Sequence, residues 1–160
     1  MRGIILSVVI ALLIVVGQPV GASIIVPPGT TIPCDFVTGG GFIVGSGTSS
    51  LAAGAKANFA VGGGVKNGAF WGHLEYIDHG PNGPKVHGTS VTNYVILSTN
   101  TRQIDGTAQV NGQDGFTYKV VVKDNGEPGT DDSFSIQLSN GYSAGGKLGG
   151  GNIKIHHPCE

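Results

Sequence analysis

Apolar and polar residues alternate along most of this chain. Phe116, Tyr118 and Val120 are separated by the polar residues Thr117 and Lys119. The same period of two continues elsewhere, with apolar positions at Ile104, Ala108, Val110, Phe134, Ile136, Leu138, Ile153 and Ile155. No long segment shows the apolar spacing of an amphipathic helix. Alternation over this much chain predicts antiparallel strands that each bury one face.

Turn signals separate the alternating segments. The dipeptide Asn-Gly occurs five times, at 67–68, 82–83, 111–112, 125–126 and 140–141. It is the strongest short-range hairpin signal, because both residues tolerate a positive φ. Between the turns we expect strands near 35–45, 55–63, 69–78, 84–88, 91–98, 103–110, 115–123, 132–139 and 151–157. About nine short strands predict an all-β fold, an antiparallel β-sandwich of the jelly-roll type.

The first 22 residues have the pattern of a cleaved secretory signal peptide. A short basic start is followed by an apolar run over residues 3–16, and small residues end the segment at 20–22. The run is short for a membrane span, although an uncleaved anchor is the alternative. We therefore expect a secreted, extracellular protein with a lead-in at 23–33 and one domain at 34–160. Because no second apolar run follows, we expect no membrane attachment after cleavage.

The chain has two cysteines, Cys34 and Cys159, one near each end of the predicted domain. In an oxidising compartment they are expected to pair. The closed loop contains almost the whole domain, which corresponds to about 4–5 kcal/mol in the chain-entropy model. Pairing would also make the first and last strands neighbours. The alternative is a zinc site formed by Cys159 with His156 and His157, but these residues lack the usual ligand spacing.

The charge of the chain is close to neutral. It has nine basic and ten acidic residues, and loss of Arg2 with the signal peptide makes the balance slightly more acidic. There is no basic cluster of the kind that binds nucleic acid or anionic lipid, so neither is an expected partner.

Glycine is unusually common, with 29 residues, and it gathers in runs at 39–41, 62–64 and 145–151. One interpretation is a flat backbone surface for a sugar or another chain. The other is close packing and curvature of the sheets, which glycine permits at bulges and close approaches.

The stretch GHLEYIDHG, at 72–80, carries the densest group of potential metal ligands. In a strand, His73 and Glu75 lie on one face, and His87 reaches them if the next strand pairs alongside. Two histidines and a carboxylate form a candidate zinc site. The alternative is the polar outer face of an ordinary strand.

The stretch DNGEPGTDD, at 124–132, is a second candidate metal site. Its four carboxylates belong to Asp124, Glu127, Asp131 and Asp132. Calcium binds several oxygen ligands on a loop, so calcium is the candidate cofactor here, although the spacing is not that of an EF-hand. The alternative is a polar hairpin loop whose side chains close turns.

Two further motifs concern catalysis and sugar binding. GYSAG, at 141–145, matches the serine-hydrolase motif in letters, but no helix is expected after Ser143, so we interpret it as a turn. Trp71 and Tyr142 lie near glycine-rich bends and are the candidate residues for stacking on a sugar ring.

Several segments in this order resemble one known family. They are VTGGGFI (37–43), AKANFAV (55–61), GHLEYIDHG (72–80), KVHGTSV (85–91), DGTAQVNG (105–112) and DNGEPGTDDSFSIQLSNGYSAGGKLGGGNIKIH (124–156). Together they resemble the post-choice-of-anchor (post-COAP) type of domain, found in secreted and cell-surface proteins of bacteria and archaea. The resemblance covers nearly all of the predicted domain. It implies an extracellular β-domain and brings no catalytic residues.

These observations favour a secreted, non-catalytic binding or structural module at or near the cell surface. Its expected partners are an extracellular polysaccharide or a surface protein. The alternative is a carbohydrate-binding module assisted by calcium. A metal-dependent enzyme that uses His73, Glu75 and His87 is the least favoured reading.

Overall fold

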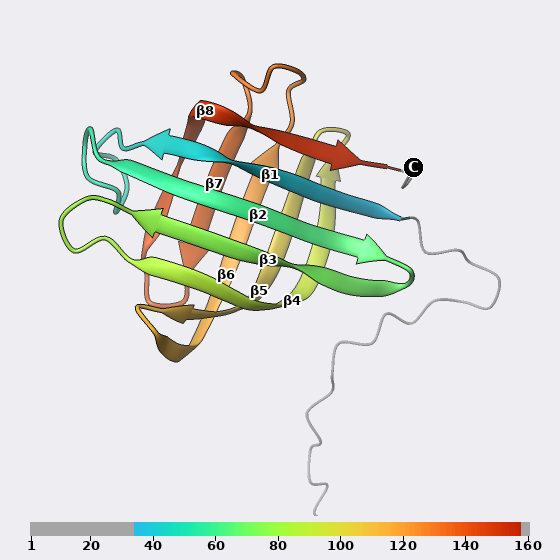
Figure 1. Ribbon diagram of the computed structural model, residues 1–160, viewed down its shortest axis with the longest axis horizontal. Helices are drawn as coiled ribbons and strands as arrows, with labels where there is room; N and C mark the ends of the chain where they lie inside the picture. The colour runs from blue at the N-terminus through green and yellow to red at the C-terminus, as the bar shows by residue number, and fades with distance from the viewer. Residues whose placement is uncertain (1–33, 158–160) are drawn as a thin grey trace, which may run out of the picture.

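The computed structural model describes residues 34–157, which form a closed antiparallel barrel of eight strands (Figure 1). The strands are β1 (Asp35–Val44), β2 (Lys56–Lys66), β3 (Ala69–Asp78), β4 (Lys85–Ser98), β5 (Thr101–Val110), β6 (Gln113–Lys123), β7 (Ser133–Leu138) and β8 (Ser143–His156). Each strand pairs with the next one in the sequence, and β8 returns to pair with β1. The predicted all-β class is confirmed.

The predicted jelly-roll sandwich is wrong, because the sheet closes on itself. The pairing of β1 with β8 extends from Phe36 opposite His156 to Ile43 opposite Leu148. Alternation cannot separate the two architectures, since a strand buries one face in both. The expected proximity of the first and last strands is confirmed.

The count of nine strands is also wrong, because one strand was divided into two, and another was predicted too short. The expected strands at 84–88 and 91–98 are one strand, β4, whose pairing with β5 shifts register at Gly88/Ser90 and again at Val91/Asn93. The glycine-rich segment at 145–151 is part of β8 and not a bend. Bulges increase local twist, so these two long strands can pass from one side of the barrel to the other. Figure 1 shows the consequence, with β1, β2 and β3 crossing in front of β5, β6 and β7 at a steep angle.

Glycine permits a close approach of backbones where β1 meets β8. A Cβ added at Gly151, whose φ is +111°, would lie 2.1 Å from the carbonyl oxygen of Gly40. A Cβ at Gly41 would lie 2.2 Å from the carbonyl oxygen of Gly150. These glycines therefore serve the close packing and curvature of the barrel, in agreement with the second interpretation of the glycine runs.

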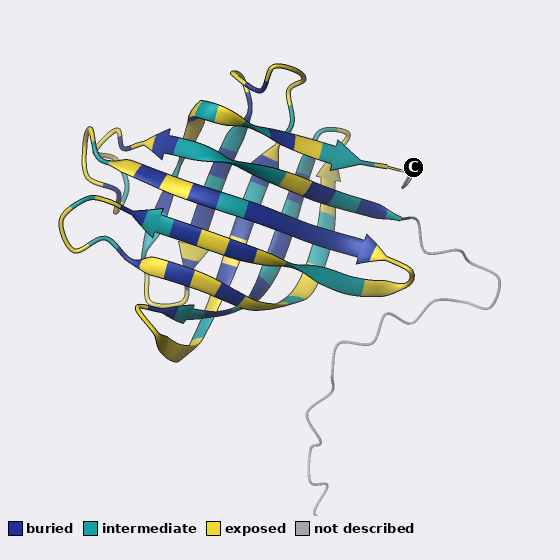
Figure 2. Cartoon of the chain, in the orientation of Figure 1, coloured by how far each residue is buried: buried dark blue, intermediate teal, exposed yellow. Residues whose placement is uncertain are grey.

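Side chains fill the interior of the barrel, as expected for a barrel of eight strands. Figure 2 shows buried and exposed residues alternating along the strands. Phe134 on β7 stacks on Phe59 of β2 with ring centroids 4.0 Å apart, and Tyr76 of β3 follows at 6.0 Å. The inward-facing residues form one contiguous cluster that includes Ile104, Ile136 and others that are almost completely buried.

A buried ion pair closes one mouth of the barrel. The guanidinium of Arg102, on β5, donates to both carboxylate oxygens of Asp35, on β1, at 2.8 Å each. Tyr94, on β4, donates its hydroxyl to the same carboxylate. Burial by itself raises the pKa of Asp35, but the hydrogen bonds from Arg102 and Tyr94 outweigh it and hold that pKa below 3.8. These three side chains join the front and rear of the barrel.

A tyrosine pair and a carboxylate close the opposite mouth. Tyr142, just before β8, donates its hydroxyl to Asp78 at 2.9 Å. Because its one proton is used there, Tyr142 accepts from Tyr76, at 2.7 Å. The Asp78 carboxylate also accepts the backbone N–H of Gly80 at 2.7 Å. This network connects the hairpin between β7 and β8 to the end of β3.

All four tyrosines of the chain are expected to remain protonated well above pH 10.0, their ordinary pKa. Burial raises the pKa of Tyr76 and of Tyr118 to about 12, and it raises the pKa of Tyr94 and Tyr142 further. The unfolded chain ionises first, so the stabilisation is complete below pH 10.0 and is lost as the pH rises toward 12. Tyrosinate absorbance and circular dichroism should therefore change together in one alkaline transition. Gradual ionisation centred at pH 10.0 with unchanged circular dichroism would contradict this, and the urea-unfolded chain provides the reference.

Two expectations concern the ends of the chain. Within residues 34–157, no helix is long and apolar enough to cross a membrane. The predicted signal peptide, the lead-in at 23–33 and Cys159 all lie outside the described residues. Among those residues there is no free cysteine, so the thiol of Cys34 is not free, and the disulfide with Cys159 stays a prediction.

Candidate functional site

The outer side of β1, β2, β3 and the second half of β8 forms a surface that we call the front face. Its aromatic residues gather at one end, where Phe36 contacts Trp71 edge to face with ring centroids 5.3 Å apart. His156 stacks on the other side of Phe36 at 4.4 Å, and its Nε2 lies 2.9 Å from the hydroxyl of Thr38. The three half-buried rings form one aromatic cluster built from three different strands.

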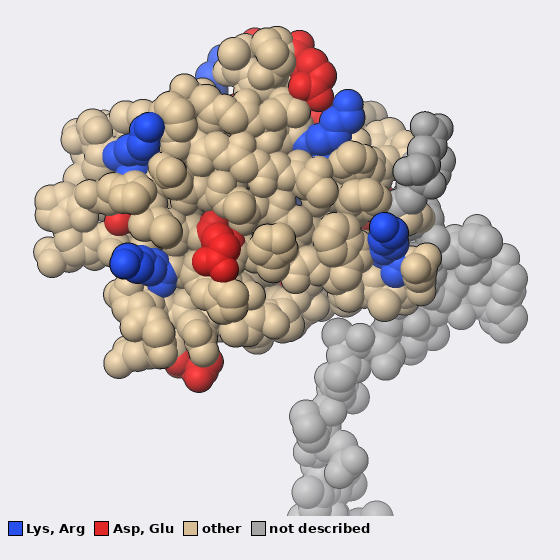
Figure 3. Space-filling model, viewed as in Figure 1, with Lys and Arg blue, Asp and Glu red and all other residues tan. Residues whose placement is uncertain are grey.

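Small residues form a flat floor beside this cluster. Gly40 on β1 and Ala60 on β2 are partly exposed there, whereas Gly62 on β2 is buried beside the side chains of Trp71 and His73. A Cβ at Gly62 would lie 3.6 Å from the ring of Trp71, so the indole lies directly beside the backbone of β2. Figure 3 shows that this face is mostly uncharged, with a few acidic and basic side chains separated by wide uncharged areas. A flat uncharged floor beside aromatic rings fits an extended ligand better than a small enclosed one.

The indole N–H of Trp71 is buried and has no hydrogen bond partner within residues 34–157. This N–H is therefore unused among the described residues, and a buried donor without an acceptor costs free energy. The ring packs against Phe36 and lies beside the backbone of Gly62.

The candidate zinc residues come together only in part. Glu75 lies directly opposite His87, and its carboxylate contacts Nδ1 of that imidazole. Both side chains are about half exposed. His73 lies on the same outer face, beside Gly62, without a contact to this pair. In the described part of the chain, no three histidine, cysteine, aspartate or glutamate side chains are grouped so that they could hold a metal ion.

The surface beside Glu75 is only slightly concave. A shallow hollow of about 200 Å³ is lined by Asn58, Phe59, Ala60, Glu75 and Ile77. Of the three candidate zinc residues, only Glu75 lines it. The arrangement is a polar pair on an open sheet face, which corresponds to the alternative reading of GHLEYIDHG.

The candidate calcium loop instead supplies hydrogen bonds to an edge of β8. Asp132 is completely buried and accepts the backbone N–H of Ile153 at 2.8 Å and that of Asn125 at 2.7 Å. Asp124 accepts the N–H of Ile155 at 2.9 Å. These amides need acceptors because β7 pairs with β8 only as far as Lys147. Carboxylates of the loop therefore take the place of a missing stretch of strand.

The other two carboxylates of the loop contact lysines on β8. Asp131 pairs with Lys147 at 2.8 Å, and Glu127 lies 3.4 Å from Lys154. Glu127 also accepts from the side-chain amide of Asn152 at 3.2 Å. Thus all four predicted ligands have partners within the protein. The loop bonds to the part of β8 that β7 does not reach.

The two candidate sugar-stacking residues lie in different places. Trp71 belongs to the front face, whereas Tyr142 is bonded to Tyr76 and Asp78 at a mouth of the barrel. In the motif GYSAG, Ser143 begins β8, so a strand follows where a hydrolase would have a helix.

Sequence reasoning did not predict that the charged side chains of Asp35, Asp78, Arg102 and Asp132 are buried. For three of them a signal was present. Asp35 is in phase with Val37, and Asp78 is in phase with Leu74 and Tyr76. Arg102 is likewise in phase with Ile104 on the inner side of β5. A charged residue at an inward position of an alternating segment indicates a buried polar network.

Comparison with protein-family models, curated proteins and solved structures gives no match for this chain. The resemblance to the post-COAP type of domain therefore stays a hypothesis.

Proposed function

We propose that the protein is a secreted, non-catalytic module that works at or near the cell surface by binding through its outer faces. The observation that carries the proposal is the filled barrel. Stacked aromatic rings occupy the interior, and the Asp35–Arg102 pair and the Tyr142–Asp78 contact occupy the two mouths. Contacts with a partner are therefore made by the outside of the sheet.

The front face is the surface that supports binding of an extended partner. Its flat floor would allow a polymer to lie across several strands, and Phe36 and Trp71 would supply apolar contact area. These features favour an extracellular polysaccharide, so a carbohydrate-binding module is the form of the proposal that we test. Calcium takes no part in it, because the loop carboxylates accept hydrogen bonds from β8.

Trp71→Ala should weaken retention of the protein on an insoluble cell-surface polysaccharide. Loss of a central aromatic contact corresponds to about 2 kcal/mol, or roughly thirtyfold in Kd. The measurement is a depletion isotherm, in which the unbound protein is quantified over increasing amounts of polysaccharide. The folded state of the variant is checked by its circular dichroism.

Two control variants define the result. Trp71→Phe retains an aromatic ring and should keep most of the retention. Leu97→Ala removes an apolar side chain that is 51% exposed on β4, a strand outside the front face, and it should change nothing. Equal weakening by Trp71→Ala and Leu97→Ala would mean that retention is unspecific adhesion, and the front face would lose its assigned role.

A metal-dependent enzyme is the competing reading, and the contact between Glu75 and His87 is its only support. An acid–base pair needs a concave site that holds a substrate against it. The pair lies on an open face, with both side chains about half exposed. The geometry therefore favours the binding module.

A further inference from the structure

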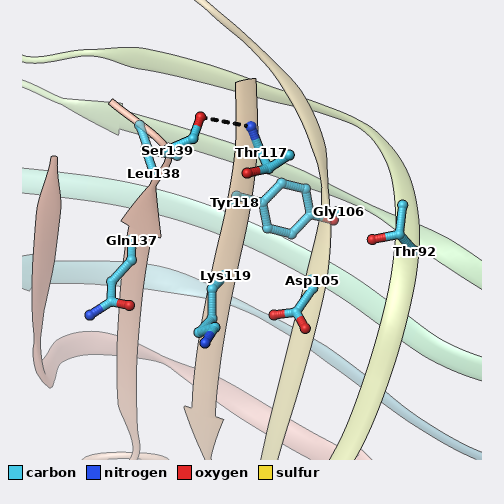
Figure 4. Close-up of a pocket in the computed structure, with 9 residues that line it drawn as sticks. All are labelled: Thr92, Asp105, Gly106, Thr117, Tyr118, Lys119, Gln137, Leu138 and Ser139. Carbon is cyan, nitrogen blue, oxygen red and sulfur yellow. Dashed lines mark hydrogen bonds between the residues drawn. The ribbon is translucent and has the colours of Figure 1, made fainter. Parts of the chain in front are cut away.

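A second concave site lies on the opposite side of the barrel, on the outer surface of β5, β6 and β7. It is a hollow of about 280 Å³, lined by Thr92, Asp105, Gly106, Thr117, Tyr118, Lys119, Gln137, Leu138 and Ser139 (Figure 4). None of these residues belongs to the front face or to the candidate metal sites. The volume approaches the lower end of the range found for small-molecule pockets.

Three polar side chains form a row across the hollow. Asp105 lies directly opposite Lys119 in the pairing of β5 with β6, and Lys119 lies directly opposite Gln137 in the pairing of β6 with β7. Figure 4 shows the Asp105 carboxylate on one side of Lys119 and the Gln137 amide on the other. Three adjacent strands cover about 10 Å, which matches the size of one sugar ring with its hydroxyl groups.

The acceptor in this row is held in place by its neighbours. Gln103 donates its side-chain amide to both oxygens of Asp105, at 3.0 and 2.9 Å, and Asn93 donates to one of them at 3.0 Å. A ligand therefore meets a carboxylate whose orientation is already fixed, so less conformational entropy is lost on binding.

The donors in the row are not used by the protein. The side chains of Lys119 and Gln137 make no hydrogen bond and no ion pair within residues 34–157, although Asp105 is the cross-strand neighbour of Lys119. Thr117 and Ser139 add hydroxyl groups at the rim, and the Ser139 oxygen accepts the backbone N–H of Thr117 at 3.1 Å. Tyr118 and Leu138 supply apolar lining.

From this arrangement we infer that the hollow binds a neutral sugar unit through two neighbouring hydroxyl groups. A hydroxyl can donate to Asp105 and accept from Lys119 at the same time, and a second hydroxyl can meet Gln137, which both donates and accepts. A simple cation would be repelled by Lys119, and a simple anion by Asp105. The inference extends the proposed function with a separate site and a ligand class.

The test is an NMR titration of the isotopically labelled chain with glucose, galactose and mannose in turn. With at least one of these hexoses, the side-chain amide signals of Gln103 and Gln137 should shift and reach saturation. Lys119→Met and Asp105→Asn should each weaken binding about tenfold or more, since each removes a charge-assisted hydrogen bond. Lys123→Met, an exposed outward position on the same strand, is the matched control and should leave binding unchanged.

Several outcomes would overturn the inference. They are the absence of saturable shifts with all three hexoses, equal shifts in native protein and Lys119→Met, and saturation by glycine, a zwitterion, without saturation by a hexose. Trp71→Ala should retain the hexose shifts, because the front face shares no residue with the hollow. Failure of the hollow with intact polysaccharide retention would therefore refute this inference and leave the proposed function standing.

Discussion

Replacing Arg102 with methionine should lower the free energy of unfolding by about 3–5 kcal/mol, as expected when one partner of a buried ion pair is removed. Arg102 is 2% exposed and Asp35 is 5% exposed, so the carboxylate would remain buried without its countercharge. The variant would also lose the hydrogen bond from the guanidinium to the carbonyl oxygen of Ser98, at 2.6 Å. Urea unfolding of native and variant protein measures the difference.

The double variant Asp35→Leu with Arg102→Met is the control for this prediction. A buried ion pair that is replaced by apolar residues of similar volume often costs little, so the double variant should recover much of the loss. If Arg102→Met alone changed the stability by less than about 1 kcal/mol, the ion pair would not be the element that closes this mouth.

The pH dependence of the effect follows from the pKa of Asp35. The folded-state pKa lies below 3.8, so the stabilisation is present above pH 3.8 and is lost as the pH falls through the folded-state pKa. In Arg102→Met the guanidinium no longer lowers the pKa of Asp35, so the variant lacks this loss of stability at low pH. The difference in stability between native protein and Arg102→Met should therefore shrink as the pH falls below 3.8.

The second large effect is expected for Asp132→Ala, at about 3–5 kcal/mol. The substitution leaves the backbone N–H groups of Ile153 and Asn125 without their acceptor in a buried place, and hydrogen bonds to a charged group contribute about 1.5–3 kcal/mol each. Besides lower stability in urea, hydrogen exchange at the Ile153 amide should become faster. These two measurements locate the damage at the edge of β8.

Asp131→Ala is the matched control, because it removes a neighbouring carboxylate of the same loop. Asp131 and its partner Lys147 are 68% and 73% exposed, so no measurable loss of stability is expected. A rise in melting temperature with calcium that Asp132→Ala abolishes would contradict the structural role and establish the calcium site instead.

Most of the strands could be predicted from the sequence because local physics determines them. Alternation located β6 and β7 to within two residues at each end. The Asn-Gly turns at 67–68 and 111–112 have both residues at positive φ, as hairpins of this kind require. Neither result depends on contacts between distant parts of the chain.

Closure of the barrel could not be predicted in the same way. It depends on the pairing of β1 with β8, which are more than a hundred residues apart, and on the bending of β4 at its bulges. A strand that buries one face has the same alternation in a sandwich and in a barrel. The glycine run at 145–151 was placed outside the predicted strand at 151–157, whereas in the structure it belongs to β8 and allows that strand to approach β1 closely.

The candidate sites were likewise predictable only where they depend on local sequence. The sequence grouped Asp124 and Asp132 correctly in one loop, but their acceptor role toward Ile155 and Ile153 depends on β7 being short. The row formed by Asp105, Lys119 and Gln137 was not predicted, since it requires the register of three strands.

The central claim is that ligands bind to the outside of a filled barrel, and mapping the response of each residue tests it most directly. The labelled chain is titrated with soluble fragments of a cell-surface polysaccharide while all backbone amide signals are followed. The account predicts saturable shifts at outward positions such as Trp71 and Lys119, with inward positions such as Phe134 and Ile136 unchanged. Saturable shifts centred on Phe134 and Ile136, with the outer positions unchanged, would mean that the ligand enters the barrel and would contradict the claim.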